Sequence, residues 1–94
     1  MSQGDREQRE VHYAGRVQVV GFRYTVRSLA TRFEVTGFVR NLPDGRVHLV
    51  VEGAAAEIDG FLQAVRAEMR YYIENTQETV RPGSGRFPSF EIRH

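Results

Sequence analysis

The sequence contains neither cysteine nor lysine, since all 13 of its positively charged Lys or Arg positions are arginines. Without cysteine, the chain has no disulfide, no zinc–thiolate site and no nucleophile for a cysteine phosphatase. Without lysine, it has neither the lysine of a nucleotide-binding P-loop nor an amine for a Schiff base. A phosphate site in this chain would therefore depend on arginine, asparagine and backbone amides.

The low net charge, the lack of a long apolar run and the small number of histidines limit the possible classes of protein further. The net charge of +1 gives no general attraction to nucleic acids or anionic membranes, and no apolar run approaches the ~20 residues of a membrane span. Residues 1–8 are polar and unlike a signal peptide, so we expect a loose tail there, one domain over residues 9–94, and a cytoplasmic protein. The histidines, His12, His48 and His94, are far apart in the sequence, so we expect no metal site and no cofactor.

Hydrophobic periodicity divides the chain into strands and helices. Val11 and Tyr13 lie two residues apart, as on one face of a strand, whereas Phe22, Val26 and Leu29 recur at helical spacing. The sequence predicts strands over residues 9–15, 35–41, 46–52, 71–80 and 87–93 and helices over residues 22–33 and 54–69. In this βαββαβ order with one further strand, each helix follows a strand and precedes another. The pattern favours an α+β, ferredoxin-like sandwich, in which an antiparallel sheet carries both helices on one face.

The segment from Gly15 to Arg23 predicts a short loop that leads from a strand into a helix. Such a loop points several backbone N–H groups at one place, beside the positive end of the helix. Arg23 opposes that helix dipole by a few tenths of a kcal/mol up to about 1 kcal/mol, and a bound anion would relieve the repulsion. Its guanidinium group also suits a doubly charged oxyanion. The other interpretation is that Gly15 and Gly21 only permit a tight turn.

Three segments carry a resemblance to a known family. Residues 15–23 read Gly-Arg-Val-Gln-Val-Val-Gly-Phe-Arg and resemble the first signature of the acylphosphatases, roughly G-x-V-Q-G-V-x-F-R. Residues 37–47 resemble the second signature of that family, and residues 90–94 resemble its closing strand. The resemblance covers residues 9–94. It implies the same ferredoxin-like fold and a metal-independent enzyme that hydrolyses small acyl phosphates to carboxylate and phosphate, for which we expect a monomer without nucleic-acid or membrane partners.

The resemblance also implies roles for particular residues. Arg23 would bind the phosphoryl group together with the loop amides, and Asn41 would orient the attacking water. The candidate phosphate-binding loop comprises Gly15, Arg16, Val17, Gln18, Val19, Val20, Gly21 and Phe22. From the residues alone, Asn41 is equally explained as an asparagine that caps a turn, and the sequence does not place it beside Arg23. If the substrate's own phosphate oxygen accepts the water's proton, the pH–rate profile should show no pKa of His12 or His48.

One residue departs from the family pattern, because Val19 stands where the family usually has glycine. If this position required a positive φ, valine would cost about 1–3 kcal/mol, and Val19→Gly would raise the affinity for phosphate. The alternative function is therefore an anion-binding module of the same fold with little turnover. A third hypothesis, an RNA-binding sheet, needs exposed aromatic residues and a basic face, and only Phe38 and its neighbours faintly suggest them.

Overall fold

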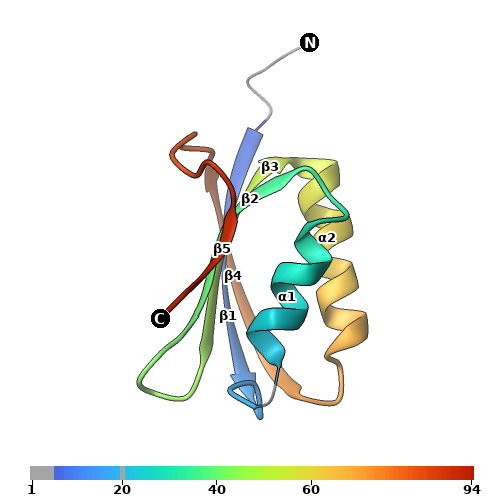
Figure 1. The fold of residues 1–94 in the computed structure, drawn as a ribbon, viewed down its shortest axis with the longest axis vertical. Coiled ribbons are helices and arrows are strands. Elements are labelled where there is room, and N and C mark those ends of the chain that lie inside the picture. The colour runs from blue at the N-terminus through green and yellow to red at the C-terminus, as the bar shows by residue number, and fades with distance from the viewer. Residues whose placement is uncertain (1–5, 20) are drawn as a thin grey trace.

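The computed structural model describes residues 6–19 and 21–94, which form one sheet backed by two helices. In chain order the elements are β1 (Arg6–Gly15), α1 (Phe22–Ala30), β2 (Val35–Asn41), β3 (Val47–Ala54), α2 (Ala55–Glu68), β4 (Ile73–Pro82) and β5 (Phe90–Arg93). The five strands lie in the order β4-β1-β3-β2-β5. Both helices cover the same face of the sheet (Figure 1), which confirms the ferredoxin-like α+β prediction. Neither helix of the described segments combines the length and the apolar character needed to cross a bilayer.

The core lies between the helices and the sheet face that they cover. Val11 and Tyr13 of β1 are only 1% and 3% exposed, as their alternation in the sequence predicts. The helices bury the apolar stripes that their spacing predicts, namely Phe22, Val26, Leu29 and Ala30 in α1 and Ile58, Phe61, Leu62 and Val65 in α2. Each large side chain buried in this way contributes roughly 1.5–3 kcal/mol, so the stripes hold α1, and the loop before it, against the sheet.

The prediction of an antiparallel sheet is wrong at one edge, because β5 pairs with β2 in parallel. The physical reason lies in the connection between β4 and β5, which occupy opposite edges of the sheet. The chain has to cross the helix-free face to pass from one edge to the other, and it then enters β5 in the direction of β2. The last strand also begins at Phe90 rather than at residue 87.

This crossing segment is bound to the centre of the sheet by Glu52 of β3, whose side chain is completely buried. The backbone N–H and hydroxyl of Ser84 donate to Glu52 Oε2 at 2.8 and 2.6 Å, and the N–H of Gly85 donates to Oε1 at 2.9 Å. The side-chain amide of Gln8 adds a hydrogen bond of 2.6 Å. Burial by itself would raise the pKa of Glu52, but these hydrogen bonds outweigh burial and hold the pKa below its ordinary value.

Other predicted boundaries also shift, and β4 runs over Ile73–Pro82 rather than over residues 71–80. Residues 6–8 are not part of a tail, because β1 begins at Arg6, which lies opposite Ala54 of β3. Strands pair through backbone groups, and the polar side chains of residues 6–8 show no hydrophobic pattern from which a strand could be predicted. Residues 1–5 of the expected tail lie outside the described residues. Helix α1 ends at Ala30, and the chain continues to residue 33 in turns, in which the N–H of Thr31 donates to the carbonyl of Ser28.

Candidate functional site

The loop between β1 and α1 has a glycine with positive φ at each end. At Gly15, φ is +127°, and a Cβ there would lie 2.5 Å from the carbonyl oxygen of Tyr72, so no other residue fits without a shift. That carbonyl instead accepts a hydrogen bond from the N–H of Arg16 at 2.9 Å. Gly21 caps the N-terminus of α1 with φ at +77°, a left-handed conformation that glycine adopts at little cost. The glycines thus fix the course of the loop.

Gln18 connects the loop to the hairpin between β2 and β3. Its side-chain amide donates to the carbonyl of Leu42 at 2.6 Å and to the carbonyl of Arg46 at 2.9 Å. Asn41 immediately precedes Leu42 and lies two residues after Val39, so its side chain is on the sheet face that the helices cover. The loop, the start of α1 and the end of β2 therefore meet at one corner of the molecule, a meeting that the sequence did not reveal.

A pocket of about 340 Å³ lies at this corner. Its lining residues are Val17, Gln18, Val19, Gly21, Phe22, Arg23, Tyr24 and Asn41. Arg23 and Asn41 thus share one pocket. Two predicted members of the loop, Gly15 and Arg16, do not line it, because they hold the turn against Tyr72, and Val20 lies outside the described residues.

Sequence reasoning missed Tyr24 as a member of this pocket. Tyr24 is 55% exposed on the first turn of α1, although it belongs to a helix whose buried stripe is otherwise apolar. Its position in the sequence could have indicated this role, because Tyr24 is an aromatic residue that directly follows Arg23 and lies outside the apolar stripe. This exposed residue lines the pocket, and the guanidinium carbon of Arg27 lies 5.4 Å from its ring centroid.

The pocket contains a positively charged group, on Arg23, and a polar atom, Oδ1 of Asn41, for which the described residues provide no ion-pair or hydrogen-bond partner, respectively. Among the described residues, Arg23 forms no ion pair with a carboxylate, and its Nη1 lies 3.4 Å from Nδ1 of His94. The Oδ1 atom of Asn41 is buried without a hydrogen-bond partner in the described part of the chain. Leaving a buried acceptor unpaired costs about 1–3 kcal/mol, so Asn41 is poised to accept a hydrogen bond from a molecule in the pocket.

The loop amides divide into two groups. The N–H of Arg16 donates to Tyr72 and the N–H of Phe22 donates to the carbonyl of Val19 at 3.2 Å, so both are engaged within the protein. The N–H groups of Val17, Gln18 and Val19 donate to no described residue. These amides lie beside the N-terminus of α1, which has no acidic residue in its first turn, and the arrangement suits an anion.

Val19 does not strain the loop. No described non-glycine residue has a positive φ, so Val19 avoids the left-handed region that valine tolerates poorly. Its side chain is 37% exposed at the pocket, while the neighbouring Val17 is fully buried and anchors the loop in the core. The strain that would have weakened the loop is therefore absent.

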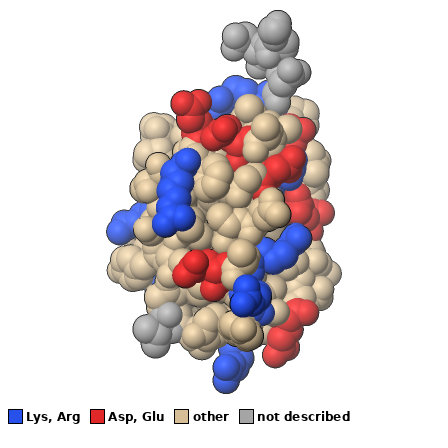
Figure 2. Space-filling model, turned by 90° about the vertical axis from the view of Figure 1, so that its right-hand side faces the viewer, with Lys and Arg blue, Asp and Glu red and all other residues tan. Residues whose placement is uncertain are grey.

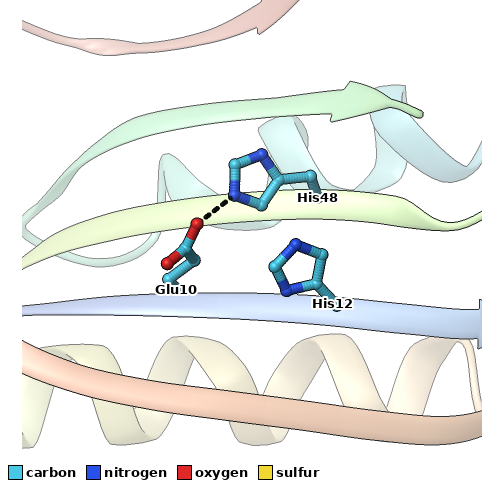
Figure 3. A group of neighbouring side chains, drawn as sticks. All are labelled: Glu10, His12 and His48. Atoms are coloured by element: carbon cyan, nitrogen blue, oxygen red, sulfur yellow. Dashed lines mark hydrogen bonds and ion pairs between the residues drawn. The ribbon is translucent and has the colours of Figure 1, made fainter.

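A second cluster brings together two histidines that are far apart in the sequence. His12 and His48 face each other across β1 and β3, and their rings stack with centroids 4.6 Å apart. With Glu10 they offer three ligand atoms within 4.8 Å of one another, and Figure 3 shows all three side chains on one side of the sheet. In sequence the two histidines are widely separated, so only the strand register could reveal the pair.

The hydrogen bonds of this cluster indicate a structural network. Nε of Arg40 donates to Nδ1 of His48 at 3.0 Å, so that nitrogen carries no proton and Nε2–H donates to Glu10 at 2.7 Å (Figure 3). Arg81 binds the other oxygen of Glu10 at 3.0 Å. For Nε2 of His48 to bind a cation, the ring proton would have to move to Nδ1, where Arg40 donates, and the nearby charge of Arg81 also opposes a cation. The cluster is therefore a poor metal site, although its residue types are those of one.

The helix-free face also bears on the hypothesis of an RNA-binding sheet. Phe38 is only 7% exposed, because Phe87 and the guanidinium group of Arg93 lie over it, the latter 4.0 Å from the ring centroid. Its ring is not available for a base to stack on. On the helix-covered side, basic and acidic side chains are interspersed rather than gathered by sign (Figure 2).

Comparison with known proteins gives consistent matches over nearly the whole chain. The acylphosphatase family model matches residues 9–92. An acylphosphatase of Archaeoglobus fulgidus is 35% identical over 85 residues, covering 90% of this chain and 96% of the relative, and one of a Synechococcus species is 39% identical over 90 residues, covering 95% of each. The crystal structure of acylphosphatase from Bacillus subtilis superposes with a TM-score of 0.86 at 30% identity, covering 94% of this chain and 99% of that one.

Proposed function

The chain belongs to the acylphosphatase family, and we propose that it hydrolyses acyl phosphates through the pocket that Arg23 and Asn41 share. An acyl phosphate is already activated, because the carboxylate is a good leaving group. The protein then has to fix the phosphoryl oxygens and align a water molecule with the bond that breaks. The observation that supports the proposal is that one pocket holds an arginine and an amide oxygen for which the described residues provide no ion-pair or hydrogen-bond partner, respectively.

In this proposal the phosphoryl group lies between the guanidinium group of Arg23 and the free amides of the loop. Val17, Gln18 and Val19 supply N–H groups that donate to no described residue, and α1 adds the positive end of its dipole. Relief of the repulsion between Arg23 and that dipole adds to the binding of a dianion. The amides of Arg16 and Phe22 act indirectly, by holding the loop in shape.

The attacking water donates a hydrogen bond to Oδ1 of Asn41 and reacts in line with the leaving group. The new bond joins the water oxygen to phosphorus, the bond between phosphorus and the acyl oxygen breaks, and the carboxylate leaves with the electron pair. The proton of the water passes to a phosphate oxygen of the substrate, so no side chain needs to change its charge. Asn41 suits this role, because an amide orients water without titrating.

The test is the hydrolysis of benzoyl phosphate in the presence of a metal chelator. We expect Arg23→Ala and Asn41→Ala each to lower kcat/KM by about 10²-fold or more. Arg23→Ala should also weaken inhibition by inorganic phosphate strongly, whereas Asn41→Ala should lower kcat with little effect on that inhibition. The matched controls are Arg66→Ala and Asn75→Ala, which are exposed and lie outside the pocket.

The same assay decides the alternative of a weakly active binding module. Phosphate binding by the folded protein without turnover would favour that module. Full activity of Asn41→Ala would instead contradict the role of Asn41. The φ of Val19 is not positive, which argues against a strained loop and favours turnover.

The pH–rate profile tests the proton's destination. His12 and His48 lie on the helix-free side of the sheet, away from Asn41, and neither lines the pocket. His94 is the histidine near Arg23 among the described residues. We expect a profile without a histidine pKa, unchanged in His94→Gln. A limb of the profile that disappears in His94→Gln would show that this imidazole handles the proton.

We also propose that the protein acts as a monomer in the cytoplasm. The pocket that Arg23 and Asn41 share is already formed within one chain, which fits a monomer. A sequence without cysteine fits a reducing compartment, where disulfides are rare. Sedimentation velocity at micromolar concentration should give one species of about 10.8 kDa, the mass of one chain, and a dimer would contradict the proposal.

A further inference from the structure

A larger hollow adjoins the pocket along α1. It has a volume of about 600 Å³ and lies between α1 and the segment that leads into β5, elements that pack side by side (Figure 1). We call it the α1–β5 groove. Its lining includes Tyr24, Arg27, Ser28, Thr31, Pro88 and Phe90.

Tyr24 joins the groove to the pocket, because it lines both. Tyr24, Arg27, Ser28 and Thr31 follow the i, i+3, i+4, i+7 spacing that places side chains on one stripe of a helix. Arg23 at the pocket and Arg27 in the groove are four residues apart, a rise of about 6 Å along the helix. A molecule whose phosphoryl group occupies the pocket therefore has the groove as its next surface.

The burial of Asn41 and the exposure of Tyr24 indicate which end of the substrate points to the groove. Oδ1 of Asn41, which holds the water in the proposed reaction, is buried, whereas Tyr24 at the rim is 55% exposed. The leaving group departs on the side of phosphorus opposite the water. The acyl group is thus directed away from the buried Asn41, toward the rim and Tyr24.

The chemistry of the groove suggests what kind of acyl group it accepts. Phe90 and Pro88 offer apolar surface, which suits a flat or apolar body. The guanidinium group of Arg27 lies against the ring of Tyr24 and forms no ion pair with any described carboxylate. A cation in this position, next to an apolar wall, favours a ligand that carries an anionic group beyond its apolar body.

We propose that the α1–β5 groove binds the acyl part of the substrate and that Arg27 selects acyl groups carrying a carboxylate of their own. The inference rests on the proposed function, because it assumes that the phosphoryl group lies at Arg23. Arg27 takes no part in bond breaking, and its contribution is to the specificity for the acyl group.

The test compares two substrates that differ in one charge, 4-carboxybenzoyl phosphate and 4-carbamoylbenzoyl phosphate. We expect the unmodified protein to prefer the carboxylate in kcat/KM by about three- to fivefold, the upper part of the range for an exposed charge pair. In Arg27→Gln the ratio should fall to within twofold of unity. The matched control is Arg32→Gln, which removes the same charge at an exposed position outside the groove and should retain the preference.

A binding measurement separates this inference from the proposed function. Titration with 4-carboxybenzoylphosphonate and its carbamoyl analogue, which lack the hydrolysable bond, reports on the groove even without turnover. A carboxylate advantage in binding that Arg27→Gln abolishes supports the groove, whatever the outcome of the activity assay. Equal affinity of the unmodified protein for the two analogues, or an advantage that persists in Arg27→Gln, would overturn it.

Discussion

Glu52 shows at the scale of one residue how a buried charge serves the fold. Its carboxylate accepts hydrogen bonds from Gln8, Ser84 and Gly85 and so fastens the crossing segment to the middle of the sheet. In Glu52→Gln one oxygen becomes an NH₂ group, which then faces donors. We expect a loss of about 2–3 kcal/mol in the free energy of unfolding, measured by urea denaturation. Glu68→Gln, at an exposed position, should change it by less than about 0.5 kcal/mol.

For Val19 the structure predicts the opposite of the sequence, which had suggested that Val19→Gly would raise the affinity for phosphate. With a negative φ at Val19, glycine would relieve no strain, and it would add conformational freedom to the unfolded chain. We expect Val19→Gly to lower the free energy of unfolding by about 0.5–1 kcal/mol and to leave the calorimetric affinity for phosphate within about twofold. A tenfold gain in affinity would instead show that the valine holds the loop amides away from the anion.

At the scale of elements, the site depends on the alignment of the loop with the β2–β3 hairpin. Gln18 provides that alignment through its hydrogen bonds to Leu42 and Arg46, and Asn41 is carried by the same hairpin. In Gln18→Ala the side of the pocket that carries Asn41 and the side that carries Arg23 can move apart. A misplacement of about 1 Å can cost up to 10²-fold in rate, so we expect kcat to fall at least tenfold.

The inhibition constant of inorganic phosphate should change less than kcat in Gln18→Ala, since Arg23 and the loop amides remain on one side of the pocket. Gln63→Ala, an exposed change on α2, is the control and should leave both parameters unaltered. Equal losses in kcat and in phosphate affinity would mean that Gln18 supports the loop itself rather than its alignment with Asn41.

The elements themselves could largely be predicted from the sequence, because each helix has an apolar stripe and β1 alternates, although β3 is buried on both faces and β4 is largely exposed. Phe22 and Val26, for instance, are buried as the spacing predicts. The direction of β5 could not be predicted from the sequence, since it depends on a connection that crosses the sheet. The proximity of Asn41 and Arg23 in one pocket also arises from the tertiary structure, and nothing in the sequence near either residue indicates where the other lies. Only the family resemblance suggested that they act together.

At the scale of the whole molecule, the helix-free face contains the groups that should make stability depend on pH. Burial is the main cause that lowers the pKa of His48, and the nearby His12 and Arg40 lower it further, although Glu10 acts in the opposite direction. The hydrogen bond with His48 is the main cause that lowers the pKa of Glu10. For both groups the unfolded chain binds protons more readily than the folded protein does. The free energy of unfolding therefore decreases as the pH falls.

The two groups act in different pH ranges, which makes His48 testable by itself. Its contribution is lost as the pH falls from the unfolded value of 6.5 through the lowered pKa of the folded state, whereas that of Glu10 is lost only below its unfolded value of 4.5. His48→Gln keeps an amide that can donate to Glu10 but does not titrate. We expect the variant's unfolding free energy, from urea denaturation at a series of pH values, to be flatter just below pH 6.5 and to retain its decrease in more acidic solution. A slope just below pH 6.5 that matches the unmodified protein would assign the acid sensitivity to other groups and leave the His48 network a purely geometric role.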